Sequence, residues 1–185
     1  MNICIFPGTF NPIHHAHLMM ANFALTKYKF DKIIFIPSYI PPHKNVNKNL
    51  ADHRYEMVKL AIKQNPKFEI SDIEYKSESP SYSLITVKKI IEQYKLENRL
   101  NFIIGTDAFS QIKTWYKAEE LKDLVHFIVF PRGEVENLKE LQDEGWDFEL
   151  TEMEHIDISS TDIRNGKHIK TDEKVKDYIK NNGLY

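Results

Sequence analysis

Short apolar runs recur along the chain, and a stretch with the spacing of a helix follows almost every run. Runs such as Ile3-Cys4-Ile5-Phe6 are typical of strands in a parallel sheet that is buried on both faces. The pattern predicts strands at residues 3–6, 32–37, 68–70, 101–104, 126–130 and 148–153. Residues 73–75 are expected to extend the third strand or to pair with it.

Helical spacing of apolar residues separates these strands. It predicts helices at residues 16–29, 51–64, 81–94, 107–111, 118–124, 138–142, 161–165 and 172–180, with a loop at residues 38–49. This alternation favours an α/β fold, with a doubly wound, mostly parallel sheet and helices on both faces. In such a sheet, ligands bind beyond the carboxyl ends of the strands.

Composition narrows the class of protein. A chain of 185 residues is the size of one domain, so we expect residues 1–185 to form a single unit. A net charge of −2 gives no general attraction to nucleic acid or to a membrane surface. The lone Cys4 excludes a disulfide framework, and no apolar stretch is long enough to span a bilayer. With no room for a signal peptide before the first strand, we expect a cytoplasmic protein.

The turn after the first strand reads PGTFNPIHHAH over residues 7–17. Gly8 lets the backbone approach a ligand closely, and the helix start beyond it offers N–H groups and a positive dipole end to an anion. His14 and His17 are three residues apart and fall on one helix face. The turn therefore predicts a site for the phosphates of a nucleotide.

Two other interpretations of this turn stay open. Three histidines in four residues could bind a metal ion, but His14 and His15 are neighbours that point in different directions, and few carboxylates lie nearby in sequence. The histidines could also be incidental to a structural turn. We favour the phosphate site over both.

Further clusters stand at other strand ends: PSYIPPHK at 37–44, PSYS at 80–83, GTD at 105–107 with Trp115-Tyr116 downstream, PRG at 131–133 and ISSTDIR at 158–164. Each has an ordinary alternative: His43-Lys44 as a solvated loop, Trp115 as core and Ser159 as a helix cap. A capped helix start with Arg164 one turn later is also a second anion site. Their common place at one rim of the sheet favours a shared site.

These motifs, in this order, resemble the bacterial nicotinate-nucleotide adenylyltransferases, a branch of the nucleotidyltransferase superfamily that carries an HxxH-type signature. The resemblance covers nearly the whole chain. The HxxH-type turn and ISSTDIR mark the superfamily, and PPHK, PSYS and the Trp-Tyr pair point to the nicotinate branch. It implies a Rossmann-like fold of the nucleotidyltransferase type.

The resemblance also implies the reaction, in which AMP passes from ATP to nicotinate mononucleotide to give nicotinate adenine dinucleotide and pyrophosphate. The acceptor phosphate attacks ATP directly, without a covalent enzyme intermediate. Mg²⁺ is implied with ATP, held mainly through phosphates and water rather than by protein ligands. By the same resemblance, His14 and His17 are the catalytic residues, and His15 is a bystander.

The remaining site residues follow from the resemblance too. The expected ATP-binding residues are Gly8, Thr9, Phe10, His14, His17, Gly105, Asp107, Ser159, Ser160, Thr161 and Arg164. The expected acceptor-binding residues are His43, Lys44, Tyr82, Ser83, Asp107, Trp115, Tyr116 and Arg132. Trp115 would stack on the pyridine ring, and N–H groups near Tyr82 and Ser83 would favour a carboxylate, which only accepts hydrogen bonds, over a carboxamide.

Four positions depart from the family pattern. Pro7 replaces a glycine and removes an N–H, Asn11 stands where Asp is also common, Ala16 replaces a glycine, and Ile85 replaces a residue that is often acidic. The alternatives are a nicotinamide-mononucleotide or pantetheine-phosphate adenylyltransferase, or a non-catalytic nucleotide-binding module of the same fold. Intact His14, His17 and Arg164 argue against the last. The sequence leaves open whether the chain forms a homo-oligomer.

Overall fold

The computed structural model describes residues 1–42, 47–77, 80–132, 137–154, 156–166 and 170–185. Within these residues, six strands form one sheet in which every neighbouring pair is parallel. The strands are β1 (Ile3–Gly8), β2 (Lys32–Pro37), β3 (Phe68–Ile70), β4 (Leu100–Gly105), β5 (Val125–Phe130) and β6 (Phe148–Leu150), in the order β3-β2-β1-β4-β5-β6. The predicted doubly wound, Rossmann-like α/β fold is confirmed.

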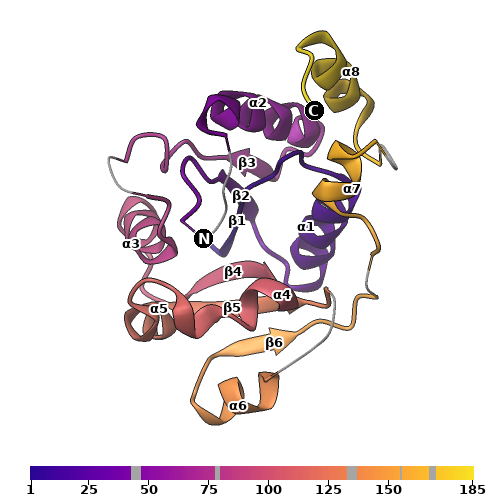
Figure 1. Cartoon of the computed structure of the whole chain (residues 1–185). Coiled ribbons are helices and arrows are strands. Elements are labelled where there is room, and N and C mark those ends of the chain that lie inside the picture. Colours follow the sequence, from indigo (N-terminus) through magenta and orange to yellow (C-terminus); the bar gives the residue numbers. More distant parts are fainter. Residues whose placement is uncertain (43–46, 78–79, 133–136, 155, 167–169) are drawn as a thin grey trace.

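Helices cover both faces of this sheet (Figure 1). They are α1 (His15–Lys27), α2 (Ala51–Ile62), α3 (Ser83–Tyr94), α4 (Thr106–Phe109), α5 (Ala118–Leu124), α6 (Leu138–Asp143), α7 (Ser160–Arg164) and α8 (Glu173–Asn181), with 3-10 turns at Lys48–Leu50 and Ile112–Thr114. No helix in the described part of the chain combines the length and apolar character that a membrane span requires.

Alternate residues of each strand pack into two separate hydrophobic cores. In β1, Ile3 and Ile5 belong to the core under α3 and α5, whereas Cys4 and Phe6 belong to the core under α1, α2 and α8. Successive side chains of a strand point to opposite faces, so an unbroken apolar run supplies both cores at once. This is why the strands read as continuous apolar runs in the sequence.

The order in which the chain adds strands to the sheet reverses between β1 and β4. Chain order runs outward from β1 through β2 to β3 on one side and from β4 through β5 to β6 on the other. The loops that leave the carboxyl ends of β1 and β4 therefore diverge, and a crevice forms between them. Among the described residues, members of each cluster that the sequence places at strand ends line this crevice.

Two of the predicted strands differ from the structure. Residues 73–75 form a turn instead of a strand, because the Asp72 carbonyl accepts from the N–H of Tyr75 (2.9 Å) and of Lys76 (3.3 Å). The last strand stops at Leu150 and not at Met153. Thr151 still donates to the Val129 carbonyl (2.9 Å), but Pro131 has no N–H with which to continue the ladder.

Candidate active site

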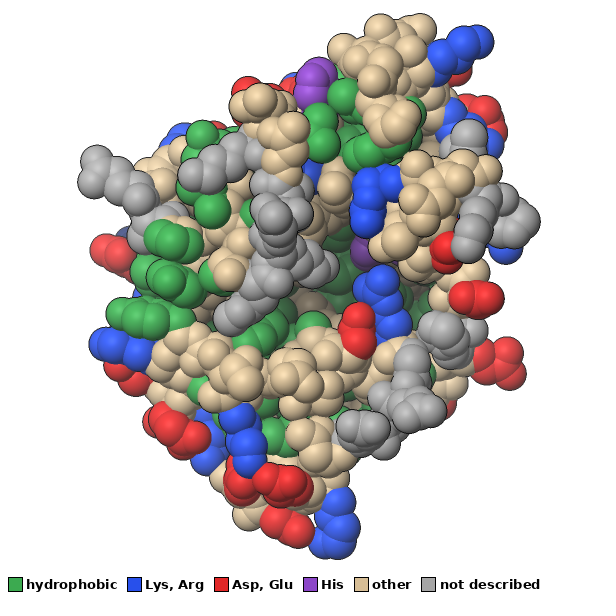
Figure 2. Space-filling view, in the orientation of Figure 1, with side chains coloured by type: hydrophobic (Ala, Val, Ile, Leu, Met, Phe, Trp, Pro, Cys, Tyr) green, Lys and Arg blue, Asp and Glu red, His purple; other side chains and the backbone are tan. Residues whose placement is uncertain are grey.

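A cleft of about 870 Å³ opens at the carboxyl ends of β1 and β4. Figure 2 shows this hollow in the face of the molecule, with a histidine at depth and basic side chains beside it. Most of the predicted site residues line the cleft, namely Gly8, Thr9, Phe10, His17, Tyr82, Ser83, Gly105, Asp107, Trp115, Tyr116, Arg132, Ser160, Thr161 and Arg164. His14 lines a smaller adjoining hollow, which shares His17, Met20 and Arg132 with the cleft.

The loop between β1 and α1 is shaped by an aromatic ring that lies over a glycine. Phe10 has a φ of 48°, and its ring packs against Phe6 and His17 with centroid distances of 5.5 and 5.1 Å. A Cβ at Gly8 would lie 2.8 Å from the Phe10 ring, well inside van der Waals contact. Gly8 is therefore needed here so that Phe10 can fold back onto the strand end.

Side chains from distant parts of the chain hold the carbonyl groups of the same loop. Each such bond is made by a residue at least 45 positions away, so the loop is fixed by tertiary contacts and not by its own turns. The bonds run from Arg54 Nη1 to Thr9 O (2.9 Å), Arg164 Nη1 to Asn11 O (2.6 Å), Ser160 Oγ to Pro12 O (2.9 Å) and Thr171 Oγ1 to Ile13 O (2.7 Å).

Pro7 causes no loss of sheet hydrogen bonding. Gly8 O accepts from Ser38 N (2.9 Å), so the backbone groups of Gly8 face β2 and those of Pro7, one residue earlier, face β4. Within the described residues, β1 pairs with β4 through Cys4 and Ile5. The missing N–H of Pro7 thus lies where the two strands have already separated at the crevice.

His14 and His17 form a stacked pair at the start of α1. Their ring centroids lie 3.7 Å apart with an interplanar angle of 27°. The His14 backbone N–H donates to His17 Nδ1 (3.2 Å). Since Nδ1 accepts this bond, the neutral His17 ring carries its proton on Nε2, which makes Nε2 the donor nitrogen.

The His14 ring is buried, with 2% of its surface exposed, and neither ring nitrogen has a hydrogen-bond partner among the described residues. Burial, and then the positive charges of Arg132 and His15, lower the pKa of His14 from 6.5 to about 3. An unpaired, buried imidazole is costly in the free protein. An anion beside it would supply the missing partner and raise the pKa again.

Aromatic side chains gather at the other end of the cleft. The rings of Tyr82 and Tyr116 are stacked, with centroids 4.6 Å apart and an interplanar angle of 25°. Trp115 is half-buried and leans on Phe102, with centroids 6.3 Å apart. Ser83 is the first residue of α3, so the N-terminus of this 12-residue helix opens into the cleft beside the aromatic rings.

In the ISSTDIR segment, one residue caps a helix and others line the cleft. Ser159 is the N-cap of α7, where its hydroxyl accepts from Asp162 N (3.1 Å) and bonds Asp162 Oδ2 (2.6 Å). It therefore serves the helix end and does not line the cleft. Thr161 and Arg164 do line the cleft and are joined by a bond from Arg164 Nη2 to Thr161 Oγ1 (3.1 Å).

The residues that follow β4 and β5 are joined by hydrogen bonds beside the cleft. The hydroxyl of buried Thr106 donates to Arg132 O and accepts from Arg132 N, both at 2.7 Å. Arg132 Nε lies 3.6 Å from Asp107 Oδ2. A Cβ at Gly105 would lie 2.6 Å from Asp107 Oδ1, so the Asp107 carboxylate folds close over the strand end.

Two predicted site residues cannot be placed, and two buried residues near the cleft were not predicted from the sequence. His43 and Lys44 lie outside the described residues. Arg54 and Glu74 were not anticipated, although Arg54 is fully buried and Glu74 is 4% exposed and lines the cleft. For Arg54 a signal exists, because it stands three and four residues before Met57 and Val58 and so puts a charge on the apolar face of its helix.

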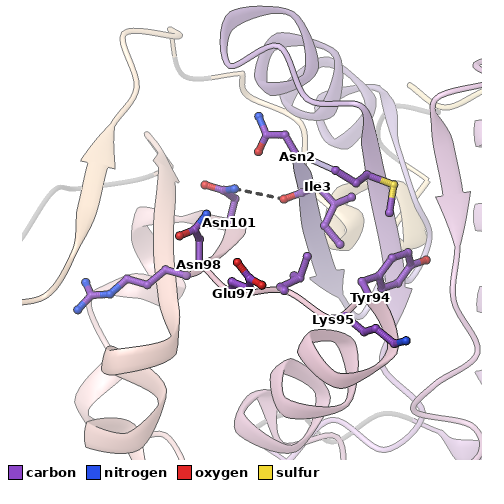
Figure 3. A pocket seen from close by; sticks show the side chains of 10 residues that line it. Asn2, Ile3, Tyr94, Lys95, Glu97, Asn98 and Asn101 are labelled. Atoms are coloured by element: carbon purple, nitrogen blue, oxygen red, sulfur yellow. Dashed lines mark hydrogen bonds between the residues drawn. The ribbon is translucent and has the colours of Figure 1, made fainter.

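In the described part of the chain, no group of three or more His, Cys, Asp or Glu side chains is placed to hold a metal ion. A second hollow, of about 540 Å³, lies at the amino ends of β1 and β4. Figure 3 shows that it is formed by the start of β1 and by the segment that joins α3 to β4, with Asn101 Nδ2 donating to Ile3 O (3.2 Å). None of the site residues predicted from the sequence lines it.

Comparison with known proteins agrees with this geometry. Residues 5–166 match the cytidylyltransferase-like family. The chain is 41% identical to a probable nicotinate-nucleotide adenylyltransferase of Caldicellulosiruptor saccharolyticus, over 100% of this chain and 99% of that protein. It is 40% identical to the nicotinate-nucleotide adenylyltransferase of Bacillus subtilis, over 99% of this chain and 97% of that protein.

A solved structure has the same fold. It is that of the Plasmodium falciparum nicotinic acid mononucleotide adenylyltransferase complexed with NaAD, with a TM-score of 0.79 and 23% sequence identity. The match covers 100% of this chain and 97% of that chain.

The burial of a neutral His14 predicts a pH-dependent stability. Between pH 6.5 and about 3 the unfolded chain binds a proton at His14 that the folded chain does not, so the free energy of unfolding falls as the pH is lowered through this window. The contribution is about 1.4 kcal/mol per pH unit. Urea unfolding of the wild type and of His14→Gln should show the steeper decline in the wild type. Parallel curves would mean that His14 titrates alike in both states.

Proposed function

Because this chain belongs to the cytidylyltransferase-like family and to its nicotinate-nucleotide adenylyltransferases, we propose that the cleft transfers AMP from ATP to nicotinate mononucleotide. One observation supports this assignment to the cleft above all. A histidine–arginine group suited to phosphates and an aromatic group suited to a pyridine ring line one cleft at the carboxyl ends of β1 and β4. The two substrates would meet between them.

In the reaction, an oxygen of the acceptor phosphate attacks the α-phosphorus of ATP. A new P–O bond forms, and the bond from the α-phosphorus to the bridging oxygen breaks. Pyrophosphate then leaves with the electron pair. The protein's contribution to such a step is to align the two phosphates and to stabilise the charge that develops between them.

The catalytic role falls to His17 and His14. Nε2 of His17 is a hydrogen-bond donor at the wall of the cleft, which is the group that a developing negative charge on a phosphate oxygen needs. His14 is stacked on His17 and has no hydrogen-bond partner among the described residues for its ring nitrogens. It would donate to a second phosphate oxygen on the side of the smaller hollow.

Arg164, Thr161 and Ser160 are proposed to hold the ATP side of the cleft, with the turn of Gly8, Thr9 and Phe10. Arg164 is already ordered by bonds to Asn11 O and Thr161 Oγ1. A guanidinium held in this way presents its remaining donors to an anion at little further entropic cost. Gly105 and Asp107, at the end of β4, would border the nucleotide.

The acceptor side is proposed to consist of Trp115, Tyr116, Tyr82, Ser83 and Arg132. Trp115 offers a flat apolar face, and the N-terminus of α3 offers backbone N–H groups to the pyridine carboxylate. A carboxamide would bring its own donors against those N–H groups, which favours the acid. His43 and Lys44 stay predictions for the mononucleotide phosphate, as does Ser159 for ATP.

Mg²⁺ is proposed to enter with ATP as part of the substrate. Magnesium retains several waters and binds readily to phosphate oxygens, so the polyphosphate itself supplies suitable ligands. Its role would be to neutralise the pyrophosphate that leaves. An oligomeric form of the protein stays a prediction of the sequence.

The function is tested by assaying the purified chain with ATP and Mg²⁺ and three acceptors: nicotinate mononucleotide, nicotinamide mononucleotide and pantetheine phosphate. We expect kcat/KM to be highest for the acid, measured as pyrophosphate release. A preference for the amide would overturn the acid specificity. Preference for pantetheine phosphate would overturn the assignment of the acceptor, and absence of turnover with all three would favour a non-catalytic module.

Replacing His17 tests the catalytic role. His17→Ala removes a donor that stabilises charge in the transition state, so kcat should fall by about 10²–10³-fold, as when one such donor is lost elsewhere. The exposed neighbour His15 provides the control, since His15→Ala should retain kcat. A near-normal rate for His17→Ala would remove His17 from the mechanism.

Replacing Trp115 tests the acceptor side. Loss of a stacking face is worth about 1–3 kcal/mol, so Trp115→Ala should raise KM for nicotinate mononucleotide by roughly tenfold or more while KM for ATP changes little. Trp146, which is buried under α6 and does not line the cleft, is the matched control as Trp146→Phe. A change confined to KM for ATP would contradict the stacking role.

A further inference from the structure

A buried arginine joins the two loops that border the cleft on the β1 and β2 sides. Arg54, in the first turn of α2, has none of its surface exposed. Its Nη1 donates to Thr9 O at 2.9 Å and to Ser38 O at 2.6 Å, and its Nη2 donates to Tyr39 O at 3.2 Å. One guanidinium therefore bonds the loop after β1 and the segment after β2 at the same time.

Ser81 holds the same segment from its other side. The Ser81 hydroxyl accepts from Tyr39 N (3.0 Å) and Ile40 N (3.2 Å), and Ser81 N donates to Ile40 O (3.0 Å). Residues 38–40 thus have their carbonyl groups and their N–H groups bonded to partners outside the segment. The segment leads directly to Pro41 and Pro42, which line the cleft.

A buried carboxylate completes this arrangement. Glu74 accepts from Thr86 Oγ1 (2.8 Å), and its Oε2 has no hydrogen-bond partner among the described residues. Burial raises the pKa of Glu74, while its polar neighbours Ser81 and Thr86 and the positive charge of Arg54 oppose that rise. The positive charge of Arg54 therefore favours the ionised form of Glu74, which lies beside Ser81 and Thr86.

We propose that Arg54, together with Ser81, is a positioning residue that sets the distance between the nucleotide loop after β1 and the acceptor segment after β2. The proposal rests on the proposed function, in which the loop after β1 holds ATP and the segment after β2 leads toward His43 and Lys44, which are predicted to bind the acceptor phosphate. Arg54 does not line the cleft. It acts through Thr9 on one side and through residues 38–40 on the other.

The chemistry of the side chain favours this role over a simply structural one. A buried charge is weak evidence for stability, since an apolar residue of similar size often stabilises as well. A planar guanidinium, however, offers several donors in a rigid fork, which a lysine ammonium cannot reproduce. Three carbonyl groups from two loops on one fork fix the separation of the loops, and in-line transfer between two phosphates depends steeply on that separation.

The test is steady-state kinetics of Arg54→Lys and Ser81→Ala with ATP and nicotinate mononucleotide. In Arg54→Lys, kcat should fall by up to about 10²-fold, the effect of misplacing reactants by about 1 Å. KM for each substrate should stay close to the wild-type value, because each loop retains its own contacts. Ser81→Ala should lower kcat in the same way but less, because Arg54 still holds the segment.

Val58→Ala is the matched control. Val58 is fully buried on the same helix but packs into the core under α1, α2 and α8. It should lower the melting temperature and leave kcat unchanged at a temperature where the chain is folded. A merely structural Arg54 would behave like Val58.

The outcomes separate the two proposals. If the wild type is active and both folded variants retain its kcat, the positioning role is overturned and the proposed function stands. Lack of turnover by the wild type overturns both. If Arg54→Lys does not fold, as judged by circular dichroism, Ser81→Ala decides: a lowered kcat with unchanged KM supports the proposal, and an unchanged kcat overturns it.

Discussion

The carbonyl groups of the loop between β1 and α1 cannot be satisfied by the sheet, because the loop begins where β1 leaves its neighbours. Buried backbone groups need partners, so the molecule supplies side chains from α2, α7 and the segment before α8. Ser160, Arg164 and Thr171, all near the C-terminus, are thereby held against the first turn. The stacked histidines follow this loop directly, and Ser160 and Arg164, which line the cleft, are bonded to it.

The same constraint explains where buried charge is tolerated. Arg54 is fully buried, yet its Nη groups donate to carbonyl oxygens at the ends of β1 and β2, where no strand offers an N–H. His14 is the opposite case, since it is buried without a partner among the described residues and its pKa is lowered to about 3. A satisfied buried group holds its partners in place, and an unsatisfied one is costly until a partner is supplied.

Much of this was readable in the sequence. The strands were predicted because each apolar run serves two cores, and the order of the motifs led to the nicotinate-nucleotide adenylyltransferases. Residues 73–75 were wrongly predicted as strand, because a short apolar run with one carboxylate fits a strand or a turn. The hydrogen bonds to the Asp72 carbonyl make it a turn. Pro7, an unexplained departure in the sequence, became intelligible once β1 was seen to separate from β4 at that residue.

The sequence by itself determined the periodicities and the motif positions, since both depend on residues close together in the chain. Tertiary structure decided which polar side chains serve the site. Ser159, predicted to bind ATP, has its hydroxyl bonded to Asp162, and Arg54, which was not predicted as a site residue, bonds two loops. A hydrogen bond needs its partner within about 3 Å. Whether residues 45 or 150 positions apart come that close is settled by how the helices pack on the sheet.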